Sequence, residues 1–327
     1  VSCMGFFHFY YSKSVFLMIF NISYTTFKLN GFLALGEWRP ILSIPYFIMF
    51  LLSCLSNSIM IYLIVSQKTL HSPMYVLIGF MSVVDLCWPI CFVPSLLLNF
   101  LFEWNGISLV SCLLQMFCIQ LLGAFQSTVL VWMALDRFFA ICRPLYYHKH
   151  MEFHSFLKCI IVPVTRNLLL NIIMISLAGK LNFCAINEID HCFCEHMGLV
   201  QLACGDISIN NLIGLVSTFL IPTSDFLFIT ASYIIIFASV MKSGKSHLKA
   251  LNTCITHIIV MTVNLAFALI AFMSYRIRNN ISPGVRVFLS TMYILFPSCF
   301  NPIIYGVRTT EIRKQEQFLK FMNQLES

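Results

Sequence analysis

Seven long apolar segments, separated by short polar connections, constrain this chain more than any other feature. A helix needs about 20 apolar residues to cross the hydrocarbon core of a bilayer. Hydrophobic residues make up 59% of the chain and charged residues 10%, against about 45–50% and about 25% in soluble domains. The pattern excludes cytosolic enzymes, nucleic-acid-binding proteins and disordered chains. It predicts an all-α membrane protein with a seven-helix transmembrane domain over 41–306, the segments lying at about 41–65, 74–99, 109–141, 155–178, 209–241, 251–275 and 285–306.

The distribution of Lys and Arg between the connections predicts the orientation of this bundle. Twelve of these residues follow the odd-numbered segments, and seven lie on the opposite side. Because cytoplasmic loops are enriched in Lys and Arg, we expect the C-terminus in the cytoplasm and the N-terminus outside. Residues 1–40 then form an extracellular N-terminus, and residues 307–327 a cytoplasmic tail with a short amphipathic helix. Asn21 begins a glycosylation sequon on the outer side.

The first 17 residues are aromatic-rich and lack a clear pattern, and the next methionine is Met18. We interpret 1–17 as a gene-model extension, with a signal peptide as the alternative.

Most of the 14 cysteines lie inside apolar segments, but four gather in one polar connection: Cys184, Cys192, Cys194 and Cys204. Such a cluster predicts disulfides in an oxidising, extracellular loop. A zinc site is the alternative, because His191 and His196 lie close to Cys192 and Cys194 in the sequence. Oxidised loop cysteines are the commoner state outside the cell, so the disulfide interpretation is preferred.

Five motifs carry a resemblance to a known family. Residues 133–145 read MALDRFFAICRPL, 70–75 read LHSPMY, 249–257 read KALNTCITH, 297–305 read PSCFNPIIY, and Ser232-Tyr233 stands in the fifth segment. In this order, over about 40–315, they resemble the motifs of olfactory receptors in the rhodopsin-like G-protein-coupled family. The resemblance implies a receptor that binds a small odorant in the helix bundle and activates a heterotrimeric G protein, raising cAMP. It implies a multi-pass protein of the plasma membrane, in the cilia of olfactory sensory neurons.

The resemblance also assigns a G-protein switch. Arg137 would be restrained by Asp136 at rest and released on activation to meet the G protein and Tyr233. The sequence departs from the family here, because the usual Tyr after this Arg is Phe138. In the seventh segment the proline removes an N–H and kinks the helix, which makes a two-state element of Asn301, Pro302 and Tyr305.

Asp85 lies in the middle of the second segment. A charge at the bilayer centre costs about 2.5–3.5 kcal/mol, so this carboxylate is expected to face the bundle interior. One interpretation is a structural polar contact between helices, with Asn57 and Asn301 as partners. The other, which the resemblance favours, is a sodium or water site that differs between inactive and active packing.

By resemblance, Cys112 pairs with Cys194 and Cys184 with Cys204, which leaves Cys192 over. The loop motifs HCFCEHM and LACGD resemble those of class I, fish-like olfactory receptors, which are associated with water-soluble odorants. The sixth segment departs from the family's usual FY pair, with Asn264-Leu265 there. The expected ligand pocket lies among the third, fifth, sixth and seventh segments, at Gln120, Gly123, Ala124, Ser217, Leu265, Ala268, Arg276 and Tyr293.

Three further polar residues bear on the ligand and the packing. A guanidinium matches a carboxylate in two-point hydrogen bonding, so Arg276 at the pocket mouth predicts an anionic, water-soluble odorant. Arg166 and Asn167 in the fourth segment are expected to face other helices.

The sequence predicts neither an enzyme nor a cofactor, because it has no Gly-rich phosphate loop, HExxH or GxSxG motif. Two alternatives to the olfactory receptor stay open. A non-olfactory receptor of the same class is the nearer one, although an amine receptor would need an acidic residue near Gln120. A transporter is the other, although we find no inverted repeats or paired broken helices.

Overall fold

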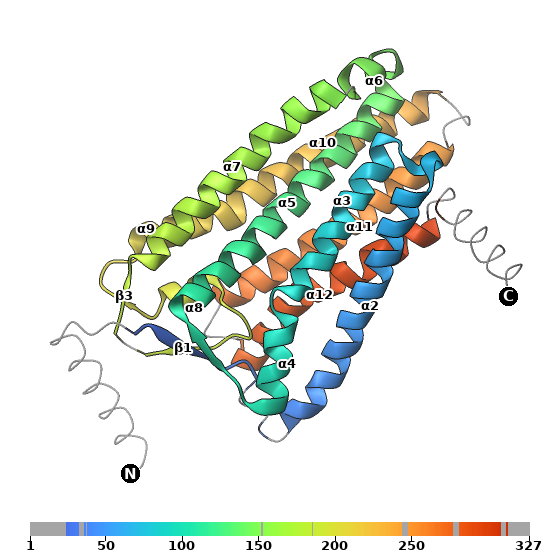
Figure 1. The fold of residues 1–327 in the computed structure, drawn as a ribbon. Helices are drawn as coiled ribbons and strands as arrows, with labels where there is room; N and C mark the ends of the chain where they lie inside the picture. The colour runs from blue at the N-terminus through green and yellow to red at the C-terminus, as the bar shows by residue number, and fades with distance from the viewer. Residues whose placement is uncertain are drawn as a thin grey trace, which may run out of the picture.

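The computed structural model describes residues 24–32, 36, 38–151, 153–184, 186–243, 248–276, 281–308 and 312. Within them, seven helical rods lie side by side in an elongated bundle (Figure 1). Their ends lie within about three residues of the predicted segments. The rods are α2 (Arg39–Ser66), α3 and α4 (Pro73–Ile90, Val93–Phe102), α5 (Leu109–Cys142), α7 (Phe153–Gly179), α9, η3 and α10 (Ser208–Leu215, Val216–Leu220, Ile221–Ser243), α11 (Leu248–Arg276) and α12 (Pro283–Arg308).

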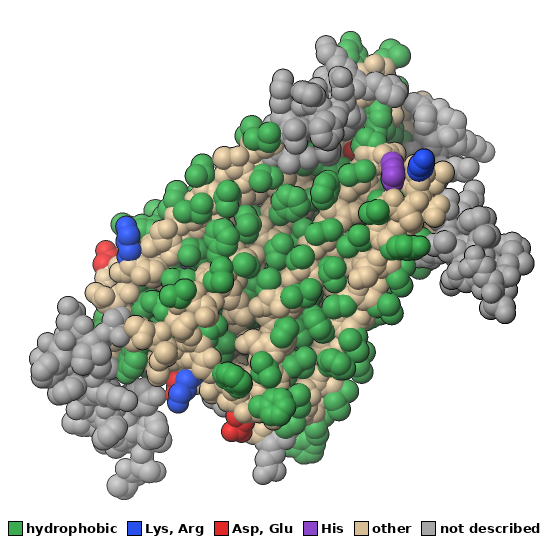
Figure 2. Space-filling model, in the orientation of Figure 1, with side chains coloured by type: hydrophobic (Ala, Val, Ile, Leu, Met, Phe, Trp, Pro, Cys, Tyr) green, Lys and Arg blue, Asp and Glu red, His purple; other side chains and the backbone are tan. Residues whose placement is uncertain are grey.

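The outer surface of the bundle is apolar, as a helix surface in contact with lipid requires. Six of the helical segments are long and apolar enough to cross a membrane, and α11 contains a shorter apolar stretch, Ile258–Ala271. Hydrophobic side chains cover the middle of the face in Figure 2, whereas the Lys, Arg, Asp and Glu side chains in view lie toward its two ends. The chain is therefore an all-α membrane protein with a seven-helix bundle.

Two rods that we predicted as continuous helices are interrupted. The second breaks between α3 and α4 at Cys91 and Phe92, between two prolines, Pro89 and Pro94. The fifth contains a π-helical turn, η3, which ends two residues before Pro222. Because proline has no N–H, the helix cannot keep its regular hydrogen bonds at these points. The three prolines are visible in the sequence, but the form of each interruption is not.

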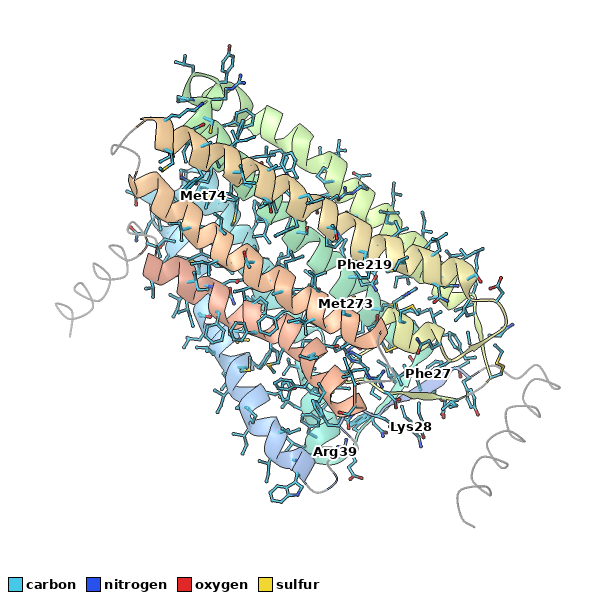
Figure 3. The ribbon with its side chains drawn as sticks, turned by 180° about the vertical axis from the view of Figure 1, so that it is seen from behind. Phe27, Lys28, Arg39, Met74, Phe219 and Met273 are labelled. Atoms are coloured by element: carbon cyan, nitrogen blue, oxygen red, sulfur yellow. A yellow bond between two sulfur atoms is a disulfide. The ribbon has the colours of Figure 1, made fainter. Side chains whose placement is uncertain are left out.

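A small layer of β-structure covers one end of the bundle (Figure 1). Strand β1 (Thr26–Leu29) pairs antiparallel with β2 (Gly106–Ser108) and parallel with β4 (Glu188–Ile189). Strand β3 (Asn182–Phe183) pairs antiparallel with β5 (Ala203–Cys204), and the short helix α8 (His196–Val200) lies between them in sequence. The segment before the first helix is thus joined to two loops. Figure 3 labels Phe27, Lys28 and Arg39 at this end and Met74 at the other.

The opposite end of the bundle holds the 3₁₀ turn η2 (Lys68–Leu70) and the helix α6 (Pro144–Met151). A buried hydrophobic cluster there includes Met74, Met133, Tyr233 and Tyr305. It packs α3, α5, α10 and α12 against one another. The amphipathic helix expected in the tail lies outside the described residues, apart from 307, 308 and 312.

Candidate functional site

A cavity of about 580 Å³ lies inside the bundle toward the end that carries the strands. Its volume is in the range of about 300–1,000 Å³ that is usual for small-molecule sites. Its walls are formed by helices α5, α7, α9, α10, α11 and α12, by the π-helical turn η3 and by the loop between β4 and α9. Among its lining residues are Ile119, Ser127, Leu170, Met174, Phe193, Met197, Gln201, Leu269, Ala271 and Ser290.

Seven of the eight residues that we predicted for the pocket line this cavity: Gln120, Gly123, Ala124, Ser217, Leu265, Ala268 and Tyr293. The eighth, Arg276, is the last residue of α11, and its side chain lies outside the described residues. Gly123 is needed for its size, because a Cβ there would lie 3.3 Å from the Trp88 ring and 3.5 Å from the Tyr293 hydroxyl. The glycine thus lets α3 and α12 approach α5.

Sequence reasoning missed the wall formed by α7, which contributes Asn167 and Asn171. Asn167 donates to the Ala124 carbonyl at 3.2 Å and to the Thr128 hydroxyl at 3.1 Å. Asn171 donates to the Phe117 carbonyl at 2.9 Å. The two asparagines are four residues apart and therefore share one face of the helix, a signal that the sequence did contain.

The prediction for Arg166 was wrong. Asn167 is buried against α5 as expected, but Arg166 is exposed on the outer surface of α7. Consecutive residues point in directions about 100° apart on a helix, so the two side chains cannot both face α5. The Arg166 guanidinium instead donates back to Asn167 Oδ1, at 3.2 and 3.1 Å.

A disulfide holds the loop between β4 and α9 over the cavity. Cys112, near the start of α5, is bonded to Cys194, with their Cα atoms 5.3 Å apart. The Cys194 N–H also donates to Gln115 Oε1 at 2.9 Å. The structure also places Cys184 and Cys204 in a disulfide, with a Cα–Cα distance of 5.8 Å.

In the loop, some of the atoms that the zinc alternative needs as ligands are already bonded to other groups. Cys194 is used in the disulfide, and His191 Nδ1 accepts the backbone N–H groups of Cys192 and Phe193 at 2.9 and 3.2 Å. The residues that the structure describes contain no group of three His, Cys, Asp or Glu side chains arranged to hold a metal ion.

A polar core lies deeper in the bundle, around the fully buried Asp85. Its two carboxylate oxygens accept from Gln126 of α5 at 2.8 Å and from Asn301 of α12 at 2.9 Å. The expected contact with Asn301 is therefore present, and Gln126 was missed. We also expected Asn57 to contact the carboxylate, but it does not. It donates to the carbonyls of Ser53 and Ser298, both at 2.9 Å, because the backbone of α12 at its kink offers a free acceptor there.

The residues predicted for the switch lie at the end of the bundle that carries α6. Asp136 is buried and Arg137 is partly exposed, and their Oδ2 and Nε atoms are 3.4 Å apart. The Tyr147 hydroxyl of α6, which sequence reasoning missed, donates to the other Asp136 oxygen at 2.9 Å. Burial, and then the neighbouring Asp136 carboxylate, raise the pKa of Tyr147 above its ordinary range, so the hydroxyl keeps its proton as a donor. Tyr305 donates to the Met133 sulfur at 3.6 Å in the same region.

Two buried histidines in the loop predict that stability falls at acid pH. Burial, and then the charge of Arg286, lower the pKa of His191 from 6.5 to about 3. Burial lowers the pKa of His196 from 6.5 to about 4. Because the unfolded chain then binds more protons than the folded one below about pH 6.5, the free energy of unfolding decreases as the pH falls through that window.

Thermal unfolding of the receptor in detergent, measured from about pH 7 to about pH 4.5, tests this. The midpoint is expected to fall with pH, and less steeply in His191→Asn, which keeps an acceptor but does not titrate. Equal slopes for the variant and the wild type would contradict the assignment to His191.

Comparison with known proteins agrees with this geometry. The sequence model of the olfactory receptor family matches residues 46–322. The human protein Olfactory receptor 52B6 is 38% identical over 87% of this chain and 85% of its own length. Olfactory receptor 52A5, also human, is 36% identical over 88% of this chain and 92% of its own length. Human Olfactory receptor 52K1 is 34% identical over 88% of this chain and 92% of its own length. The chain therefore belongs to the olfactory receptor family of odorant-sensing G-protein-coupled receptors.

Proposed function

We propose that an odorant bound in the cavity shifts the helix packing so that Arg137 leaves Asp136 and a stimulatory heterotrimeric G protein is activated, which raises cAMP. The observation that carries the proposal is the continuity of α5. This helix contributes Gln120 and Gly123 to the cavity, Gln126 to the polar core, and Asp136 and Arg137 to the far end. From Gly123 to Arg137 the helix rises about 21 Å.

The polar core supplies the two-state element that such a mechanism needs. Asp85 joins α3 to α5 and to the proline-kinked α12 through two hydrogen bonds. A movement of α5 or α12 has to exchange these bonds, and packed interiors switch between discrete arrangements more readily than they deform. An odorant shifts the equilibrium only by its difference in affinity for the two arrangements. A sodium ion or waters that bind at Asp85 more tightly in one arrangement would shift the same equilibrium separately.

The proposed setting follows from the charge distribution. The end with the strands and disulfides would face outward, and the end with Arg137 would face the cytoplasm and the G protein. We place the receptor in the plasma membrane, in sensory cilia. Asn21 would carry a glycan on the outer side, although it lies outside the described residues.

The test is cAMP accumulation in cells that express the chain at their surface, across a panel of alcohols, amides, ketones, acids and esters. A concentration-dependent response supports the proposal. Silence toward the whole panel from a surface-delivered receptor would count against it. Uptake of radiolabelled agonist without a cAMP response would instead favour the transporter alternative.

Short carboxylic acids and their methyl esters test the role predicted for Arg276. A charge-assisted contact of about 1.5–3 kcal/mol makes the acid about tenfold to a hundredfold more potent than the ester. Arg276→Ala is expected to remove that difference, and Lys180→Ala, at the exposed end of α7, serves as the control. An acid and ester of equal potency on the wild type would contradict the prediction.

A further inference from the structure

The cavity wall formed by α5, α7, α9 and η3 carries side-chain oxygens without a hydrogen-bond partner among the described residues. Three are amide carbonyls, Gln120 Oε1, Asn171 Oδ1 and Asn211 Oδ1, and the fourth is the Ser217 hydroxyl in η3. All four residues line the same cavity. Because roughly nine in ten buried polar groups in proteins are paired, four such oxygens around one cavity mark a surface where the donor groups of a ligand can bind.

Asn171 determines which kind of group that ligand must present. Its Nδ2 donates to the Phe117 carbonyl at 2.9 Å, and the side chain is only 5% exposed. A carbonyl cannot donate, so turning the amide over would set two oxygens against each other. Asn171 Oδ1 is therefore held as an acceptor on the cavity wall. Only an N–H or O–H group can satisfy it.

The other two glutamines on α5 both have hydrogen-bond partners. Gln115 donates to the Cys91 carbonyl at 3.0 Å and accepts from the Cys194 N–H at 2.9 Å. Gln126 donates to Asp85 at 2.8 Å. Gln120 lies between these two residues on the same helix, yet its oxygen has no partner in the described part of the chain. The difference is that Gln120 lines the cavity.

The charge of the wall points the same way. Glu195 is part of the lining, with one carboxylate oxygen accepting the Gly198 N–H at 2.7 Å, and the described lining contains no Lys, Arg or His. A carboxylate placed against this wall would meet carbonyl and carboxylate oxygens, so it would have to bind elsewhere in the cavity. A neutral hydrogen-bond donor meets no such repulsion.

We infer that this wall is a donor-selecting subsite: the odorant carries a hydroxyl or an amide N–H, which Asn171 accepts, with Gln120 and Asn211 contributing. The inference rests on the proposed function, because it names the chemical class that the same cavity recognises. It predicts that an odorant without a donor leaves Asn171 Oδ1 unpaired and binds more weakly.

Pairs of isomers test the inference at constant size and composition. Hexanol is compared with pentyl methyl ether, and hexanamide with N,N-dimethylbutanamide, by dose–response in the cAMP assay. The donor compound of each pair is expected to be about tenfold more potent, equivalent to about 1.4 kcal/mol. An ether or tertiary amide as potent as its isomer would overturn the inference.

Variants then test which residues favour odorants that carry a hydrogen-bond donor. Gln120→Met and Asn211→Leu keep side-chain size and remove the carbonyl, and each is expected to reduce the potency of hexanol more than that of the ether. Asn171→Leu should do so most strongly. Because Asn171 also joins α7 to α5, surface level is measured for each variant. Asn210→Leu is the matched control, since Asn210 is buried next to Asn211 on α9 but does not line the cavity.

The outcomes separate the inference from the proposed function. Responses to ketones, esters or acids without any response to the alcohol or amide would overturn the donor subsite and leave odorant sensing intact. Unchanged selectivity in Gln120→Met, Asn211→Leu and Asn171→Leu would also overturn it. Silence toward every compound at normal surface level would overturn both.

Discussion

Arg137→Ala is expected to reduce the odorant-stimulated cAMP response at least about tenfold, while the receptor still reaches the cell surface. The guanidinium is partly exposed, with 21% of the side chain accessible, so its removal opens little of the core. Its loss does remove the positive charge that the proposed switch presents to the G protein. Asp136 keeps its hydrogen bond from Tyr147, which supports folding of the variant. A residue buried in the packing would not allow this separation of signalling from folding.

Asp136→Asn is the informative counterpart. It keeps the size of the side chain and removes the charge that attracts Arg137, so basal cAMP is expected to rise without odorant. Arg143→Ala removes an exposed arginine at the C-cap of α5 and serves as the control for general loss of positive charge. A full odorant response from Arg137→Ala at equal surface level would contradict the proposed switch. So would a loss of signal as large in Arg143→Ala.

The helices could be predicted from the sequence because lipid imposes the same requirement on every segment. Each span must be long, apolar and internally hydrogen-bonded, and that requirement is readable without knowledge of the neighbours. The interruptions at Phe92 and in η3 were not predicted. They depend on how neighbouring helices satisfy the carbonyls that Pro89, Pro94 and Pro222 leave unpaired.

The candidate site was predictable where the family resemblance or a charge inside a membrane segment marked the residue, and not where packing alone determined the contact. Asp85 and Asn301 are found in contact, yet Gln126 and Tyr147 complete the two polar clusters and belong to none of the quoted motifs. Arg166 shows the same limit. Its charge suggested a partner on another helix, but the rotation of α7 that buries Asn167 turns Arg166 outward. Helix rotation depends on all the residues of a face together.

Cys112→Ser is expected to reduce surface delivery to about a tenth of the wild-type level or less. Loss of a native disulfide typically costs about 2–5 kcal/mol, which is a large share of the stability of most proteins. Both cysteines are buried, and the bond joins α5 to a loop residue 82 positions away. The same loop residues, Phe193 to Glu195, line the cavity, so loss of the bond also releases part of the ligand site.

The second disulfide provides a graded comparison. Cys184–Cys204 spans only 20 positions, and in the chain-entropy model the difference between closing 82 and 20 residues is about 1.2 kcal/mol. Cys184→Ser is therefore expected to reduce surface delivery less than Cys112→Ser. Cys54→Ala, at a free cysteine within α2, is the control for loss of a thiol and should match the wild type.

The double variant Cys112→Ser/Cys194→Ser tests whether the two sulfurs act as one bond. If they do, the second substitution removes nothing that the first had left, so the double variant should be delivered no worse than either single variant. Independent roles for the two cysteines would instead make the losses add. Flow cytometry of an N-terminal epitope on intact cells measures delivery in all three. A free Cys112 thiol, labelled by maleimide in the delivered wild-type receptor, would contradict the bond directly.

The delivered part of Cys112→Ser is expected to keep some order in the loop, because Cys194 also donates its N–H to Gln115. Any receptor that still reaches the surface should then keep its coupling to the G protein but respond to odorant with lower potency.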